Sequence, residues 1–315
     1  MMRYYNQNEL WTSSLRISRL HHSILGLLFV LAAISVHHIT PALAFSFSQS
    51  SSDAARPYYL PTTEKEVIRE ASASISRAFL EDGINRQTIR LPLSYLMYSD
   101  KEEGFVADRA IGWQGGPQET RRFLEPLASQ MLRKVQTTTP ETVDSGLPPK
   151  IQEQVLLDFD GSSLLTAENP AGALYDIQAL LQPNTDSYYL KTIQAIEDQF
   201  SDTRGKAKRL LLLINSSWRD KSSWGIFDGA KAQKQILDRY PVTFAIDQFI
   251  MQGQKLNLLK TCPGGWSVFW TRIDYQKSGK DQPDPQLLGT FSERRPEYWE
   301  VERLLKEELK TSSST

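Results

Sequence analysis

Short apolar runs and helical periodicity alternate over residues 208–270. Residues 210–214 form an unbroken apolar run, which is typical of a strand covered on both faces of a sheet. A helical pattern follows over residues 229–240, and β-branched and aromatic residues favour a second strand over residues 242–250. This order of strand, helix and strand predicts an α/β core.

Two further apolar segments flank the turn sequence Pro263-Gly264-Gly265. Residues 256–260 and 266–275 therefore predict an antiparallel hairpin that follows the second strand. Together with the helices expected elsewhere, the pattern predicts a mixed β-sheet with flanking helices. We expect a Rossmann-like three-layer core that ends in an antiparallel hairpin.

The same pattern extends toward the N-terminus. Thr63 and Glu66 have the spacing of a capping box, so a helix is expected to begin there, and Gly83 can close it. Apolar residues alternate with polar ones over residues 89–93, and Pro92 within that segment lacks a backbone donor. We therefore expect a half-buried strand near an edge of the sheet.

The remaining elements are expected from shorter signals. Pro117 suits the first position of a helix, which Pro126 must kink or restart because proline cannot donate within a helix. The other predicted elements are strands at residues 155–159, 179–181 and 287–291, and helices at residues 188–200 and 296–310.

The composition limits the kinds of catalytic and binding site that the chain can form. The chain has 315 residues with a formal net charge of −1, so nothing indicates a nucleic-acid partner held by phosphate contacts. Cys262 is the only cysteine, which excludes an intramolecular disulfide and a cysteine-rich zinc site. All four histidines lie within the first forty residues. Removal of that segment would leave no histidine for catalysis or metal binding.

The N-terminal segment has the pattern of a cleaved targeting sequence. Arginines precede the apolar residues 23–36, and the small residues Ala42 and Ala44 follow, as in a secretory signal peptide cut after Ala44. A single membrane anchor is the alternative, although the apolar run is short for a span. Phe45 then opens a hydroxyl-rich, acid-poor stretch, which is typical of transit peptides.

The junction Ala42-Leu43-Ala44-Phe45 resembles the bipartite plastid presequence of diatoms and related algae, in which a signal peptide is cut just before a phenylalanine. This resemblance implies import through the ER into the plastid stroma. We therefore expect a signal peptide at 1–44, a transit-peptide-like linker at 45–61, an α/β domain at 62–275, and a loop with an amphipathic C-terminal helix at 276–315.

One motif suggests catalysis. The sequence Asp158-Phe159-Asp160-Gly161 follows an apolar run and resembles the first motif of haloacid-dehalogenase-type phosphatases. That resemblance implies Asp158 as the nucleophile and Asp160 as the acid/base beside a magnesium ion. Ser216, after the next apolar strand, stands where that family has a Ser or Thr that holds the phosphate.

The match to these phosphatases is incomplete. Ser162 stands where Thr or Val is expected, and no acidic pair follows a later strand, since Asp247 stands alone. The simpler interpretation is a strand that ends in a turn, because Asp and Gly are turn residues. The sequence also lacks a Walker A motif and a Gly-x-Gly-x-x-Gly motif, so no cofactor is expected.

Three separate elements resemble one known family. They are the segment Trp113-Gln114-Gly115-Gly116, the strand at residues 209–215, and the sequence Pro263-Gly264-Gly265-Trp266 that follows Cys262. In this order they resemble the DUF1995 domain family of cyanobacteria and plastids, over residues 62–275. Some plant relatives act as accessory factors in photosystem II accumulation, and others carry the domain beside an adenylate kinase. The family has no established catalytic residues or cofactor.

Two functions from different classes follow. The first is a non-enzymatic accessory protein of the plastid stroma that binds a protein partner, such as a subunit or assembly factor of a photosynthetic complex. It predicts an exposed apolar or aromatic patch. The alternative is a magnesium-dependent phosphohydrolase in which Asp158, Asp160 and Ser216 meet in one cleft. No transmembrane segment is expected after processing, and peripheral contact with the thylakoid stays open.

Overall fold

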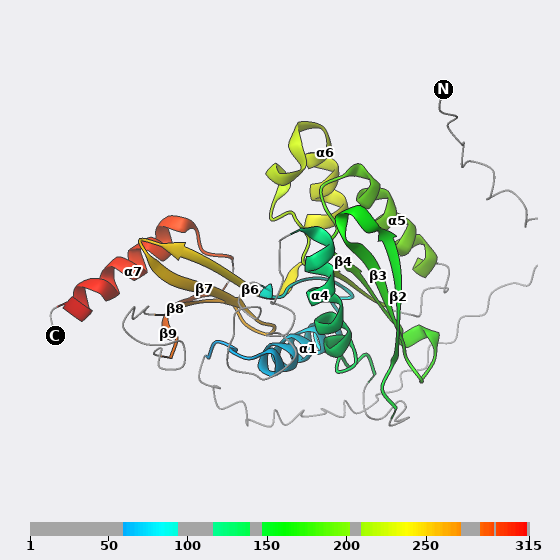
Figure 1. Cartoon of the computed structure of the whole chain (residues 1–315), viewed down its shortest axis with the longest axis horizontal. Coiled ribbons are helices and arrows are strands. Elements are labelled where there is room, and N and C mark those ends of the chain that lie inside the picture. Colours follow the sequence, from blue (N-terminus) through cyan, green and yellow to red (C-terminus); the bar gives the residue numbers. More distant parts are fainter. Residues whose placement is uncertain are drawn as a thin grey trace, which may run out of the picture. The chain divides into compact units, whose positions relative to one another are not determined.

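The computed structural model describes residues 59–93, 116–138, 147–201, 209–271, 284–292 and 294–313. In this part of the chain, one mixed sheet has the strand order β2-β3-β4-β5-β1-β6-β7-β8-β9, which can be followed from right to left in Figure 1. The strands are β1 (Arg86–Arg90), β2 (Lys150–Leu157), β3 (Ser162–Glu168), β4 (Ile177–Leu181), β5 (Leu210–Ile214), β6 (Val242–Met251), β7 (Gln254–Lys260), β8 (Trp266–Thr271) and β9 (Gln286–Phe291).

The centre of the sheet is parallel and both ends are antiparallel. Strands β4, β5, β1 and β6 run parallel to one another, whereas β2 and β3 extend one end and β7, β8 and β9 the other. The helices are α1 (Glu64–Leu80), α4 (Pro117–Leu132), α5 (Ser187–Ser201), α6 (Gly225–Ala232) and α7 (Tyr298–Ser313). A π-helical turn, Gln233–Leu237, continues α6. None of the helices in the described ranges is long and apolar enough to cross a membrane.

Both faces of the parallel centre are buried. All five residues of β5 are buried, and side chains alternate between faces along a strand. Leu210, Leu212 and Ile214 pack in a core with α1 and α4, whereas Leu211 and Leu213 pack in a second core with α5 and α6. The mixed sheet with helices on both faces confirms the predicted three-layer α/β architecture.

A third core covers the antiparallel end of the sheet on the same face as α5 and α6. Phe244 and Ile246 of β6 belong to the core beneath α1 and α4, but Ala245 between them belongs to this third core. Val301 and Leu305 of α7 pack there against β7 and β8. One face of the sheet therefore carries two separate groups of helices, α5 with α6, and α7.

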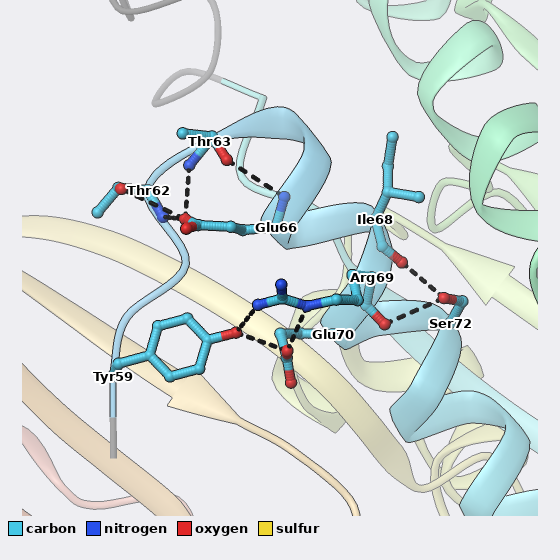
Figure 2. Close-up of polar contacts among 8 residues, drawn as sticks. All are labelled: Tyr59, Thr62, Thr63, Glu66, Ile68, Arg69, Glu70 and Ser72. Atoms are coloured by element: carbon cyan, nitrogen blue, oxygen red, sulfur yellow. Dashed lines mark hydrogen bonds and ion pairs between the residues drawn. The ribbon is translucent and has the colours of Figure 1, made fainter. Parts of the chain in front are cut away.

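The start of α1 forms through local polar contacts (Figure 2). The Thr63 side chain accepts a hydrogen bond from the Glu66 backbone N–H at 3.2 Å, and the Glu66 carboxylate accepts from the backbone N–H groups of Thr62 at 2.8 Å and Thr63 at 3.2 Å. These contacts are the predicted capping box. Beside it, the Arg69 guanidinium contacts both the Tyr59 hydroxyl and the Glu70 carboxylate.

One proline-based prediction needs correction. Strand β1 is central rather than near an edge, because it pairs with β5 on one side and β6 on the other. Pro92 lies beyond the last residue of β1, so its missing N–H breaks no pairing between strands. Pro126 lies inside α4, which continues to Leu132, so the helix does not restart there. The β6–β7 hairpin and strand β3 were not predicted as elements of their own.

The predicted hairpin is present, and a close backbone contact joins it to the next strand. Strands β7 and β8 pair antiparallel around the turn that contains Pro263, and β9 pairs with β8. A Cβ atom on Gly265 would lie 2.0 Å from the Phe291 carbonyl oxygen at the end of β9. Glycine is therefore required where β9 passes the start of β8.

Gly265→Ala is expected to lower the free energy of unfolding by about 2–3 kcal/mol, because the added methyl group meets backbone that cannot rotate away. Urea denaturation measures the change. Gly253→Ala is the matched control: Gly253 lies in the β6–β7 turn at φ +73° with open space around it. Its loss is expected to be only about 1 kcal/mol, from backbone strain. Equal losses in the two variants would contradict the close-contact argument.

Candidate functional site

The two motif carboxylates have different partners. Asp158 lies in the 3₁₀-helix η1 (Asp158–Asp160) at the end of β2, and its side chain is 72% exposed. Its carboxylate accepts a hydrogen bond from Gln118 at 3.2 Å and lies 3.7 Å from the Arg121 guanidinium, both in the first turns of α4. Asp158 therefore faces α4 at the surface.

Asp160 belongs to a separate polar network. Its carboxylate accepts hydrogen bonds from the Ser162 backbone N–H and the Asn184 side-chain amide, each at 3.0 Å, and from the Tyr189 hydroxyl. Burial raises the pKa of Tyr189, and the Asp160 carboxylate raises it further. This network joins the β2–β3 turn to the first turn of α5, which is a structural use of the carboxylate.

Ser216 bonds to neither carboxylate. It follows β5, and its buried hydroxyl has no hydrogen-bond partner. Strand β2 before the motif is an antiparallel edge strand whose side chains are mostly exposed. Within the described ranges, no group of three or more Asp, Glu, Cys or His residues is arranged to hold a metal ion.

The family-signature residues that can be described are backbone-shaping or buried. Gly116 precedes α4 at φ +124°, while Trp113 and Gly115 lie outside the described residues, as do Ala44 and Phe45. Pro263 follows a cis peptide bond, and Gly264 has φ +134°. Trp266 is buried at the start of β8, and the Arg295 guanidinium lies 5.8 Å from the centre of its ring. Trp266 of the signature therefore packs against Arg295, which lies in the loop before α7.

That arginine lines a cleft of about 280 Å³ on the sheet face that carries the two groups of helices. Its walls come from the loop after β5, the outer half of β6, and the segment that enters α7. The lining residues are Arg219, Asp247, Gln248, Phe249, Ile250, Leu258, Arg295, Pro296, Tyr298 and Val301. We refer to this site as the arginine cleft.

Two arginines contact the one carboxylate of the arginine cleft, and a third arginine lines the cleft. Oδ2 of Asp247 lies 3.4 Å from the guanidinium of Arg90 and 2.9 Å from that of Arg295. Arg90, at the end of β1, has a side chain only 12% exposed and also donates to the Trp218 carbonyl oxygen at 3.4 Å. The Arg219 side chain makes no ion pair with any described carboxylate.

The electrostatics follow from this crowding. Burial lowers the pKa of the Arg90 guanidinium; Asp247 opposes that shift, and repulsion from Arg295 and Arg219 adds to it. The nearest acid in sequence to Arg219 is the exposed Asp220, whose carboxylate accepts from the Ser222 backbone N–H at 2.8 Å and also interacts with the charge of Arg219. The buried Nε of Arg295 has no hydrogen-bond partner. The arginine cleft therefore carries more positive charge than its single carboxylate balances.

The mouth of the arginine cleft has an exposed apolar rim. Ile250 of β6 is 66% exposed and Tyr298 of α7 is 64% exposed, and both line the cleft. Trp299, the next residue of α7, is 59% exposed but is not among the residues that line the cleft. We call these three residues the aromatic rim. Large apolar side chains grouped beside arginines are typical of protein–protein contact sites.

A second charged cluster lies on this face, and its carboxylate is fully paired within the protein. The buried Glu197 carboxylate contacts Arg86 at 2.6 Å through one oxygen and Arg239 at 2.8 Å through the other. The Tyr240 hydroxyl also donates to it at 2.8 Å. Both oxygens of the buried Glu197 have partners within the protein, so the cluster stabilises the packing of α5 on the sheet.

Sequence reasoning missed the arginine cleft. Its charged residues come from four separate segments, and no spacing in the sequence connects Arg90, Arg219, Asp247 and Arg295. In the sequence, Asp247 was considered only as a single acidic residue where the phosphatase motif requires a pair. The available signals were single charged residues in or after predicted strands, which become informative only when the strand order is known.

One family model matches the chain. The model of the family described as a domain of unknown function, DUF1995, covers residues 61–303. This range contains all nine strands and the four charged residues of the arginine cleft. No curated protein and no solved structure matches the sequence.

Cys262 in the signature provides a test of the local geometry. Its buried thiol donates to the Asp82 carboxylate at 3.2 Å. Burial raises the pKa of Cys262 to about 11, and Asp82 contributes to the increase. Because the thiolate is the reactive form, alkylation by iodoacetamide at pH 8 is expected to be roughly 100-fold slower than that of a free thiol.

Asp82→Asn is expected to lower the pKa of Cys262 and to increase the alkylation rate several-fold. Glu81→Gln, which changes an exposed carboxylate one residue away, is expected to leave the rate unchanged. Mass spectrometry of time points at pH 8 and pH 10 measures both rates. Fast alkylation of the native parent protein at pH 8 would contradict the raised pKa.

Proposed function

We propose that this chain, which belongs to the DUF1995 family of domains of unknown function, is a non-enzymatic accessory protein that binds a protein partner. One observation carries the proposal: Ile250 and Tyr298 of the aromatic rim are exposed and line the arginine cleft, and Trp299 is exposed next to Tyr298 in α7. Trp, Tyr and Arg are the residue types that dominate binding energy at protein interfaces.

The phosphohydrolase alternative lacks comparable support. That mechanism requires Asp158 and Asp160 to face the same reacting phosphate, with Ser216 close by. Asp158 contacts α4, whereas Asp160 bonds to Tyr189 and Asn184. The hydroxyl of Ser216 bonds to neither. No observation in the described residues favours catalysis over binding.

The proposal also covers location. The pattern of residues 1–61, with the junction at Ala44 and Phe45, supports import through the ER into the plastid stroma. The family resemblance supports a partner among the subunits or assembly factors of a photosynthetic complex. We propose that role for the mature chain, and contact with the thylakoid surface would be peripheral.

A fusion of the full chain to a fluorescent protein at its C-terminus tests the location. In a diatom, the fusion is expected to lie within the plastid. Phe45→Ala is expected to abolish plastid import and leave the fusion in the endomembrane system, because the phenylalanine opens the transit peptide in the presequences that this one resembles. Phe47→Ala, two residues later, is the matched control and is expected to import normally. A fusion that remains outside the plastid in its parent form would contradict the proposed address.

Quantitative capture from plastids tests the partner and the surface together. The tagged mature chain is expected to enrich a photosynthetic subunit or assembly factor. Replacement of both Tyr298 and Trp299 by Ala is expected to reduce that enrichment at least tenfold, since exposed aromatic anchors contribute more than 1 kcal/mol each. Both side chains are exposed, so folding is expected to be unaffected.

Phe159→Ala is the matched control for the capture experiment. Phe159 is 73% exposed and lies in η1, outside the arginine cleft and its rim. We expect its loss to leave the capture unchanged. If Phe159→Ala removes the partner and the α7 variant does not, the contact surface lies at the β2 edge and the proposed site is wrong.

A further inference from the structure

The charge of the arginine cleft indicates what its occupant carries. Arg90 and Arg295 share the Asp247 carboxylate, whereas Arg219 makes no direct ion pair among the described residues and has only the exposed Asp220 as a more distant opposite charge. Like charges held close together in a partly buried site repel, and a bound anion relieves that repulsion. The arginine cleft is therefore complementary to a negatively charged group.

The donor geometry favours a planar oxyanion. A guanidinium presents paired N–H groups that match the two oxygens of a carboxylate. The unpartnered Nε of Arg295 is buried and lies on a side chain that lines the cleft. Its cation–π contact with Trp266 supports the Arg295 guanidinium from one side. An incoming carboxylate would meet the guanidinium groups of Arg219 and Arg295, both of which line the cleft, while the buried Nε of Arg295 stays closed to it.

The size of the cleft limits the occupant to a small group. Sites for whole small-molecule ligands are usually about 300–1,000 Å³, and the arginine cleft has about 280 Å³. Phe249, Leu258 and Val301 add apolar surface to its lining. This volume and lining fit one or two amino-acid side chains better than a nucleotide or a large cofactor.

We propose that the arginine cleft binds an acidic side chain of the partner protein, next to an apolar residue that packs on the aromatic rim. The inference rests on the proposed function and names the chemistry of that partner: a segment with a Glu or Asp beside a bulky apolar side chain. Arg219 and Arg295 bind the carboxylate, while Tyr298 and Trp299 contact the apolar neighbour.

A peptide titration tests this chemistry on the folded mature chain. The probes are N-acetyl-Gly-Glu-Phe-Gly-amide and its counterpart with Gln in place of Glu, followed by NMR chemical shifts of the backbone amides. The Glu peptide is expected to bind at least tenfold more tightly than the Gln peptide and to shift amides of the lining residues. Its affinity is expected to fall as salt is raised from 50 to 300 mM, since screening weakens exposed charge pairs.

Three variants give opposite or null results. Arg219→Gln is expected to reduce affinity for the Glu peptide at least fivefold, and Asp247→Asn is expected to increase it, because a competing carboxylate is neutralised. Arg133→Gln, an exposed arginine at the end of α4 on the other face of the sheet, is expected to change nothing. Circular dichroism melting confirms that Asp247→Asn is folded; if it is not, Arg219→Gln alone decides the sign.

Other outcomes would overturn the inference. Equal affinity for the Glu and Gln peptides would show that the carboxylate is not recognised. Inorganic phosphate that binds more tightly than the Glu peptide, with the same lining residues shifted, would indicate a site for a free oxyanion. Absence of binding by either peptide would also contradict the proposal.

The capture experiment separates this inference from the proposed function. If Arg219→Gln retains the plastid partner while the Tyr298 and Trp299 double variant loses it, the accessory function stands and the acidic contact is wrong. If neither change affects capture, the proposed contact surface itself is wrong. Loss of the partner in both, with retention in Arg133→Gln, is the expected result.

Discussion

Burial of the parallel centre on both faces is the constraint on which the rest of the structure depends. The five apolar residues of β5 leave no polar face, so helices must cover both sides of the sheet. On one face α1 and α4 make a continuous cover. On the other face the cover is divided, because α5 and α6 pack on the parallel strands and α7 packs on the antiparallel ones. The arginine cleft lies where this cover is interrupted, with Arg90 at the end of β1 and Asp247 in the middle of β6.

Two clusters of arginine and carboxylate side chains lie on that face, and they differ in how completely their hydrogen bonds are satisfied within the protein. Glu197 uses both oxygens for arginines within the protein and also accepts from Tyr240, so its hydrogen-bonding capacity is filled internally. Asp247 offers one oxygen to two arginines, while the buried Nε of Arg295 has no partner. A buried polar group without a partner destabilises the free protein. The Glu197 cluster is therefore structural, whereas the Asp247 cluster is the one for which we propose a binding role.

Local signals in the sequence were sufficient for much of the fold. The capping box of α1, the apolar run of β5 and the hairpin around Pro263 depend on neighbouring residues, and the structure contains all three. The family resemblance is confirmed by the match over residues 61–303. The central position of β1 was missed because Pro92 suggested an edge, and proline restricts only the residue that must donate.

The candidate site could not be obtained in the same way. Its charged residues meet only because β1 lies between β5 and β6, which is a property of the strand order and not of any local pattern. The motif Asp158-Phe159-Asp160 shows the converse case. Its sequence resembles a catalytic element, but the preceding strand is an antiparallel edge and the two carboxylates contact different helices, α4 and α5. A short motif therefore indicates a function only when the surrounding strands place its residues as that function requires.

The position of β1 also determines when the centre of the sheet can form during synthesis of the chain. Arg86 pairs with Leu211 and Thr88 pairs with Val242, so β1 emerges from the ribosome long before either partner exists. At about 5–20 residues per second, the delay before both neighbours are available is on the order of ten seconds. During that time the future centre of the sheet has open N–H and C=O groups on both edges, and the closing contacts span a long loop. Chaperone binding to the nascent chain is therefore most valuable at β1, which pairs with a strand on each side once folding is complete.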